Sequence, residues 1–92
     1  MSELHLSNIS AECAVLSAAT YSEAWLLEVI QSLKVNDFTR NDTRAVFTVI
    51  SNMQDRGEKV MLETVVMHEK ELEEAGYKKG YGMTISEMIG NL

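Results

Sequence analysis

A stretch in the middle of the chain most constrains the fold, because its apolar residues recur at helical spacing. Asn41 or Asp42 is expected to cap the first N–H groups of this helix, and Gly57 to supply the left-handed residue that ends it. We predict a buried central helix over residues 42–56, with the rest of the chain packed around it. The residues that form its apolar stripe are Val46, Phe47, Val49, Ile50 and Met53.

Composition limits the classes of protein to which the chain can belong. Its 92 residues make one small domain, and 46% hydrophobic content is ordinary for a folded one. Fourteen acidic residues against eight basic ones give a net charge of −6, so direct nucleic-acid binding is not expected. No apolar run approaches the roughly 20 residues of a membrane span, and the start of the chain does not resemble a signal segment. The single cysteine, Cys13, fits a reducing compartment, so we expect a cytoplasmic protein.

Two helices are predicted before the central one. Residues 1–9 form a short leader, and residues 10–92 form the helical domain. Ser10 is expected to cap a helix over residues 11–19. Ser22 is expected to cap a second helix, over residues 23–33, whose apolar residues form a clean stripe. A tight turn then places Phe38 in the core.

A fourth helix is predicted over residues 62–75, ending at Gly76. Its charged residues cluster between Glu69 and Glu74. This cluster is either an acidic docking patch or, as is more usual for such a run, a solvated helix face.

The last predicted helix begins at Thr84, which forms a capping box with Glu87. The chain stops within this helix, as expected of a truncated domain rather than of a natural terminus, and we expect part of its apolar stripe to stay uncovered. The fragment is therefore expected to self-associate weakly as a dimer through this surface. The residues of this predicted partner surface are Met83, Ile85, Met88, Ile89 and Leu92.

These patterns predict an all-α protein, a small orthogonal bundle of about five helices around the central helix and without a sheet. A single core is expected, with Phe38, Val46, Phe47 and Ile50 at its centre. Its other predicted members are Val15, Leu16, Leu26, Ile30, Leu33 and Val65.

No catalytic or metal-binding constellation is found. The run His68-Glu69-Lys70-Glu71-Leu72 matches the first part of the zinc motif HExxH, but Leu72 stands where the second histidine ligand is required. Cys13 has no neighbouring basic residue to activate it. The sequence therefore predicts a protein without enzyme activity, cofactor or metal.

Several short motifs follow one another in a specific order. They are Ala11-Glu12-Cys13-Ala14-Val15-Leu16, Leu33, Asp37-Phe38, Arg44, Val46-Phe47, Ile50, Gly57, Val60 and Thr64-Val65. Their order and separations over residues 10–92 resemble the N-terminal domain of DnaB-type replicative DNA helicases. That family has an E-x-A-V-L helix, a D-F turn, an H-R-x-I-F-x-x-I helix ending at glycine, a V-D-x-x-T-V helix and a final G-G-x-x-Y-L-x-x-L helix.

Three departures from the family pattern stand out. Thr43 replaces the usual histidine, Met61 replaces an aspartate, and residues 17–21 replace a G-S/A-L-L-L segment. Such drift indicates a phage or mobile-element relative. The helical hairpin and the RecA-like ATPase domain that follow in the family are absent from this chain.

The resemblance implies a non-catalytic collar within a parent ATP-dependent helicase. In the family this domain pairs with neighbouring subunits of a hexameric ring and helps to receive primase and the helicase loader. No binding residue is carried over, because no invariant motif marks the partner contacts. The alternative is a free-standing phage adaptor or regulator that binds a host replication protein. A small DNA-binding domain is disfavoured by the acidic charge.

Overall fold

The computed structural model describes residues 8–90, which form six α-helices and a short 3-10 helix, with no strand among them. This confirms the predicted all-α bundle. Residues 1–7 of the predicted leader, and Leu92, lie outside the described residues. The elements are α1 (Ile9–Tyr21), α2 (Glu23–Ser32), the 3-10 helix η1 (Val35–Asp37), α3 (Asn41–Asp55), α4 (Leu62–Met67), α5 (Glu69–Glu74) and α6 (Ile85–Ile89).

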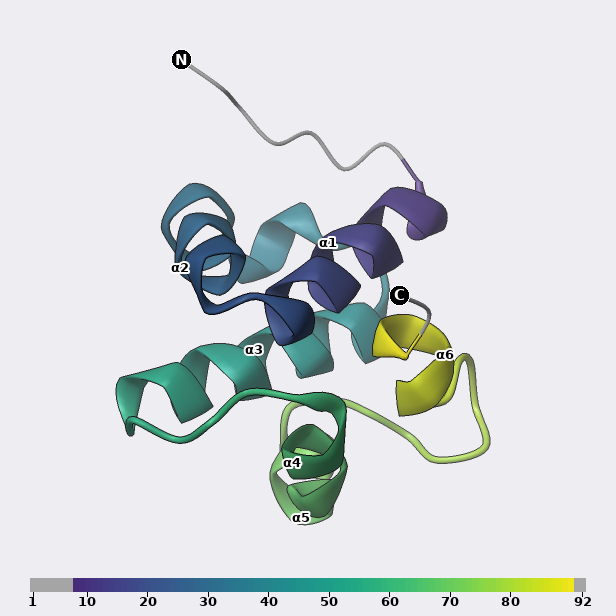
Figure 1. The fold of residues 1–92 in the computed structure, drawn as a ribbon. Helices are drawn as coiled ribbons and strands as arrows, with labels where there is room; N and C mark the ends of the chain where they lie inside the picture. Colours follow the sequence, from purple (N-terminus) through teal and green to yellow (C-terminus); the bar gives the residue numbers. More distant parts are fainter. Residues whose placement is uncertain (1–7, 91–92) are drawn as a thin grey trace.

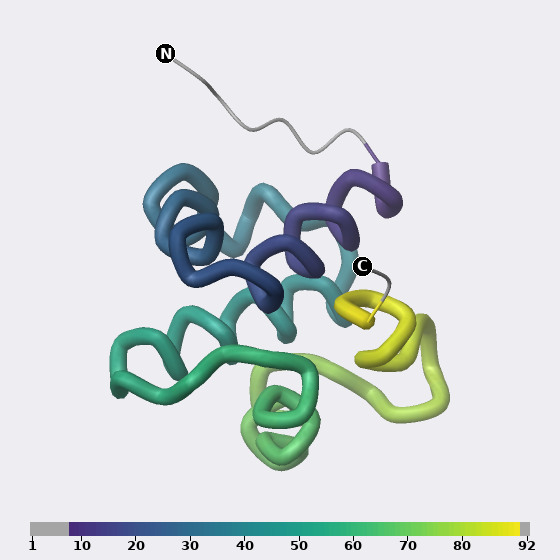
Figure 2. The backbone as a smooth tube through the Cα atoms, in the orientation of Figure 1, coloured from purple at the N-terminus to yellow at the C-terminus, as the bar shows by residue number. Residues whose placement is uncertain are grey.

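Helix α3 runs through the middle of the molecule (Figure 1). Helices α1 and α2 pack together on one side of it, while α4 and α5 lie on the other. Figure 2 shows α6, in yellow, beside α1, so the first and last helices are neighbours in space. The central helix therefore contacts elements from both halves of the chain.

The core follows the apolar stripe of α3. Phe38 and Phe47 pack with their ring centroids 4.8 Å apart, and both rings are buried. The carbonyl oxygen of Phe38 accepts a hydrogen bond from Arg44 Nε at 2.6 Å, which fixes the backbone that delivers this ring. Val15 and Ile30, expected as core members, are only partly buried and pack against the core. The fully covered side chains of α3 include Ala45, Val46, Val49, Ile50 and Met53.

Helix starts depend on side-chain caps, and one predicted cap was misplaced. Asn8, not Ser10, caps α1, since its Oδ1 accepts a hydrogen bond from the N–H of Ala11 at 2.8 Å. The predicted cap of α2 is confirmed, because Ser22 Oγ accepts from Trp25 N at 3.3 Å. The cap at Asn8 lets α1 begin at Ile9, two residues before the predicted start.

The N-cap residue of α3 was also predicted wrongly. Arg40 occupies the N-cap position, although its side chain makes no capping hydrogen bond, so neither Asn41 nor Asp42 is the N-cap residue. Asp42 lies within the helix, where its carboxylate still accepts from the first-turn N–H of Thr43 at 2.8 Å and forms the further contacts described below. The end of α3 agrees with the prediction, because Gly57 has a φ of 75° and Glu58 N donates back to Met53 O at 2.9 Å.

The predicted helix over residues 62–75 is wrong as one continuous element. It is broken at His68, whose φ of −94° and ψ of 47° separate α4 from α5. The break redirects α5 so that Glu71 meets the end of α3, and the local run Val65-Val66 has a weak intrinsic preference for helix. Sequence periodicity could not detect this, because Val65 and Leu72 are both buried across the break.

Helix α6 is short but well fixed. Thr84 and Glu87 form the predicted capping box, with Glu87 N donating to Thr84 Oγ1 at 3.1 Å and Thr84 N to Glu87 Oε1 at 2.8 Å. Ser17 Oγ on α1 donates to the carbonyl oxygen of Met88 at 3.0 Å. This bond and the apolar face of α6 attach the helix to α1.

Candidate functional site

A buried carboxylate links α1 to the start of α3. Glu12 is 0% exposed. Its Oε1 accepts hydrogen bonds from Thr43 Oγ1 at 2.7 Å and from the backbone N–H of Thr39 at 3.1 Å, and its Oε2 accepts from the Thr39 hydroxyl. A buried charge is tolerated only when such donors replace water. These donors occupy both oxygens of Glu12, so the group serves to join two elements.

A second carboxylate, that of Asp42, links α3 to the connection before α6. Arg40 Nε and Nη2 each donate to it at 3.0 Å, and the backbone N–H groups of Thr43 and Met83 donate at 2.8 and 3.0 Å. Burial raises the pKa of Asp42, but the bonds from Arg40, Met83 and Thr43 outweigh it and bring the pKa below its ordinary value. The carboxylate is therefore a fixed anion.

The approach of Gly82 to this ion pair requires glycine. A Cβ at this position would lie 2.6 Å from Asp42 Oδ2 and 2.8 Å from Arg40 Nη2, and its φ is 83°. The backbone can pass this close, and in this left-handed conformation, only without a side chain.

The two carboxylate clusters lack a free nucleophile or base. Cys13 lies beside them, with its Sγ 3.7 Å from Met83 Sδ. Burial raises the pKa of the Cys13 thiol, and the charges of Asp42 and Glu12 raise it further, which disfavours the reactive thiolate. Within residues 8–90, no group of three His, Cys, Asp or Glu side chains is placed to hold a metal ion. The clusters support the fold by joining α1, α3 and the connection before α6.

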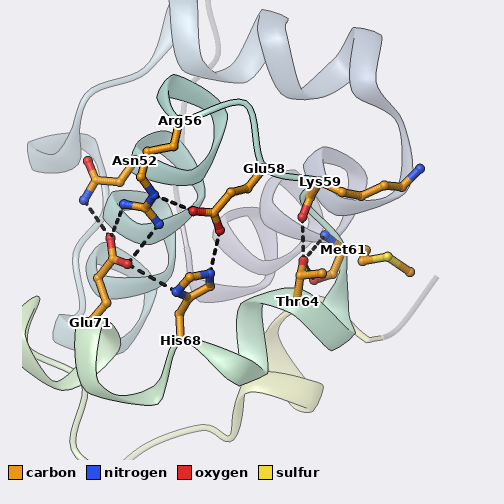
Figure 3. A network of polar contacts seen from close by, with 8 residues as sticks. All are labelled: Asn52, Arg56, Glu58, Lys59, Met61, Thr64, His68 and Glu71. Atoms are coloured by element: carbon orange, nitrogen blue, oxygen red, sulfur yellow. Dashed lines mark hydrogen bonds and ion pairs between the residues drawn. The ribbon is translucent and has the colours of Figure 1, made fainter.

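A ring of polar contacts joins the end of α3 to the break between α4 and α5 (Figure 3). Arg56 pairs with Glu58 at 2.6 Å and with Glu71 at 3.1 Å. His68 closes the ring, with Nε2 at 2.7 Å from Glu58 and Nδ1 at 3.4 Å from Glu71. Asn52 donates to the other oxygen of Glu71 at 3.1 Å. These side chains are partly exposed, so the ring sets the direction of α5 more than it adds stability.

This ring makes the stability of the domain sensitive to acid. The hydrogen bond from Arg56 lowers the pKa of both Glu58 and Glu71 in the folded chain. The ionised carboxylates therefore stabilise the fold above the unfolded-state pKa of about 4.3, and this contribution is lost as pH falls through the lower folded values. When the pH is lowered from 5 to 3, the urea midpoint of unfolding should fall in both proteins. We expect the fall to be smaller in Arg56→Gln than in wild type. Equal slopes in the two proteins would contradict the assignment.

The surface carries several exposed large apolar side chains. Two of them, Val66 and Met67, lie together at the end of α4 and are 44% and 81% exposed. Beside them is a hollow of about 190 Å³, with Glu69 and Glu73 of α5 on its edge. We call this region the α4–α5 face. The other exposed residues are Tyr21, Trp25, Leu27, Val35 and Tyr81.

Part of the C-terminal stripe was expected to stay uncovered, and for Met88 this is wrong. Ile85, Met88 and Ile89 are 8%, 0% and 3% exposed, because α6 packs against α1 and α4. Met83 is partly buried against the core, and Leu92 lies outside the described residues. A Met88→Glu substitution would therefore place a charge inside the core, where it tests folding before association.

Comparison with known protein families identifies the family of this chain. A family model described as the DnaB-like helicase N terminal domain matches residues 4–89 of the 92-residue chain. The chain belongs to this family. No curated protein and no solved structure gives a match. A DnaB-like N-terminal domain is a non-catalytic part of a replicative helicase.

The motif residues of this DnaB-like domain have structural roles. Asp37 Oδ2 accepts from Lys34 N at 2.8 Å and so shapes η1. Thr64 Oγ1 accepts from Met61 N at 3.0 Å and donates to Lys59 O at 2.6 Å, which fixes the start of α4 (Figure 3). These motif residues therefore mark how the DnaB-like domain is held together.

Sequence reasoning missed two features of the DnaB-like domain. Glu12 lies in the first turn of α1, and its spacing from Leu16 and Ala19 places it on the buried face of that helix. That spacing is the signal that could have identified it. The contacts of His68 with Glu58 had no local signal, because the two residues belong to different elements.

Within the described residues, no helix is both long and apolar enough to cross a membrane.

Proposed function

We propose that the chain is the non-catalytic N-terminal scaffold of a DnaB-type replicative helicase, and that it contributes to subunit association and docks primase or the helicase loader. The family match over residues 4–89 is the observation that carries this proposal. The small acidic bundle, with its exposed apolar side chains, supports a protein-binding role. We also propose that it acts in the cytoplasm as part of the replication machinery.

The first prediction from this proposal concerns ATP. The purified 92-residue chain is expected to show no ATP turnover above buffer, because its sequence has no phosphate-binding loop of the GxxxxGK[ST] type. The measurement is phosphate release with excess Mg²⁺ and ATP. Turnover that survives repeated purification and disappears on a point substitution would contradict the non-catalytic assignment.

The docking role is tested with the primase and the helicase loader encoded in the same genome. The chain is immobilised, and each partner is titrated by biolayer interferometry, with an unrelated acidic helical protein as the control for charge. We expect saturable binding of at least one of the two. Absence of binding to both, together with tight capture of another replication protein, would favour the free-standing adaptor. Sedimentation over a concentration series tests self-association in parallel.

A further inference from the structure

The α4–α5 face combines an apolar hollow with an exposed apolar edge. Leu72, Tyr77 and Ile85, from three consecutive segments of the chain, line the hollow, and each is at most 9% exposed. Val66 forms one wall, and Met67 beside it is 81% exposed. The volume of about 190 Å³ is below the roughly 300–1,000 Å³ of small-molecule sites. The hollow is therefore sized for a single large apolar side chain from a partner.

Charge around the hollow identifies the kind of partner. Glu69 and Glu73 stand one helical turn apart on its edge, and both are exposed. Helices α4 and α5 together carry five glutamates and one lysine, Lys70. Lys79 also borders the hollow, but it is 81% exposed and lies 3.9 Å from Glu69. The charged side chains that line the hollow, Glu69, Glu73 and Lys79, thus give it a net charge of −1.

A second copy of the chain does not fit this face well. Pairing the same face of two copies would bring Glu69 and Glu73 against their own equivalents, and like charges placed together oppose association. A basic surface complements these charges and approaches faster for the same reason.

We propose that the α4–α5 face docks a basic amphipathic helix of a partner protein, with one leucine-sized side chain in the hollow and lysine or arginine residues near Glu69 and Glu73. This rests on the proposed docking function and adds the location of the site and the chemistry of the partner. It uses the helix-in-groove mode, in which an apolar side chain anchors and the flanking charges orient. Residues of the face that contact the core keep their places, so docking needs no unfolding.

The test uses a synthetic probe, a fluorescein-labelled helix of about 18 residues with leucine at i, i+3, i+4 and i+7 and lysine elsewhere. Its anisotropy is titrated with wild type, with Met67→Glu and with the matched control Leu27→Glu on α2. Met67 and Leu27 are both exposed in the domain, and both variants gain the same negative charge. We expect Met67→Glu to weaken binding by roughly tenfold, and Leu27→Glu to leave it within about twofold.

Charge is tested separately with Glu73→Lys and the control Glu28→Lys, which change the net charge equally. Glu73→Lys is expected to weaken binding of the probe by roughly tenfold, and Glu28→Lys is expected to weaken it less. Equal effects within either pair of variants overturn the proposal, because they indicate general attraction to an acidic protein. A probe of the same composition with its leucines scrambled must bind much more weakly; equal binding, or no binding of the original probe, also overturns it. Thermal unfolding of each variant confirms that it remains folded.

The same variants separate this inference from the proposed function. If primase or loader binds wild type and Met67→Glu equally, the site is wrong while the docking function stands. If both native partners fail to bind wild type while the probe shows the expected differences, the face is confirmed and the docking function is wrong.

Discussion

Replacing Phe47 with alanine is expected to lower the free energy of unfolding by about 3–5 kcal/mol. The ring is only 4% exposed and packs against Phe38, so truncation removes apolar contacts and leaves a cavity beside a second aromatic ring. A domain of this size has a total stability of about 5–15 kcal/mol, so much of the margin would be lost. The measurement is urea unfolding followed by circular dichroism.

Tyr21→Ala is the matched control for this substitution. It also removes an aromatic ring, but from a side chain that is 81% exposed at the end of α1. The change should stay within about 0.5 kcal/mol. An equal loss in the two variants would mean that aromatic truncation acts through the unfolded chain and that the position of Phe47 is not central.

Glu12→Ala is expected to destabilise the domain by about 3–5 kcal/mol, which is unusual for removal of a charged side chain. The substitution removes the carboxylate that accepts from the Thr39 N–H and from the hydroxyls of Thr39 and Thr43. The Thr43 hydroxyl keeps a second acceptor, the carbonyl oxygen of Arg40, at 3.2 Å. It also opens a cavity, since Glu12 is 0% exposed. Glu73→Ala is the control, because that glutamate is exposed and its loss should cost less than about 0.5 kcal/mol.

Thr43→Val tests the same contact from the other side. Valine keeps the shape of threonine but removes the donor that lies 2.7 Å from Glu12, at an expected cost of about 1.5–3 kcal/mol. In the double variant with Glu12→Ala, the two losses should not add, because each removes the same hydrogen bond. Additive losses would show that the residues do not act as a pair.

Local signals in the sequence predicted much of the fold. The apolar period around Val46 and Ile50 identified the central helix to within one residue at each end. Ser22, Gly57 and Thr84 marked helix boundaries correctly, because caps and left-handed glycines act within a few residues of themselves. The order of the motifs was specific enough to indicate the family.

Features that depend on distant residues were not predicted. The break at His68 depends on Glu58 and on the end of α3, which periodicity within residues 62–75 cannot reveal. Met88 is buried by packing against α1, which lies at the other end of the chain. Both errors have the same origin: a helical pattern shows which face of a segment is apolar, but not which element covers that face.

The candidate site was only partly predictable. The acidic run of residues 69–74 suggested a docking patch, with a solvated helix face as the simpler alternative. The apolar part of the site consists of Val66 and Met67 beside a hollow lined by Leu72. This part could be recognised only from the folded structure. Val66 is exposed at the end of α4, and the break at His68 directly follows that helix.

The pairing of α1 with α6 has a consequence for how the protein is made. The bond from Ser17 to Met88 spans 71 positions, so this part of the core closes a loop of most of the chain. Synthesis proceeds from the N-terminus, and α1 therefore leaves the ribosome long before its partner. The side of α1 that receives α6 stays exposed to water, or to a chaperone, until residues 85–89 have been added.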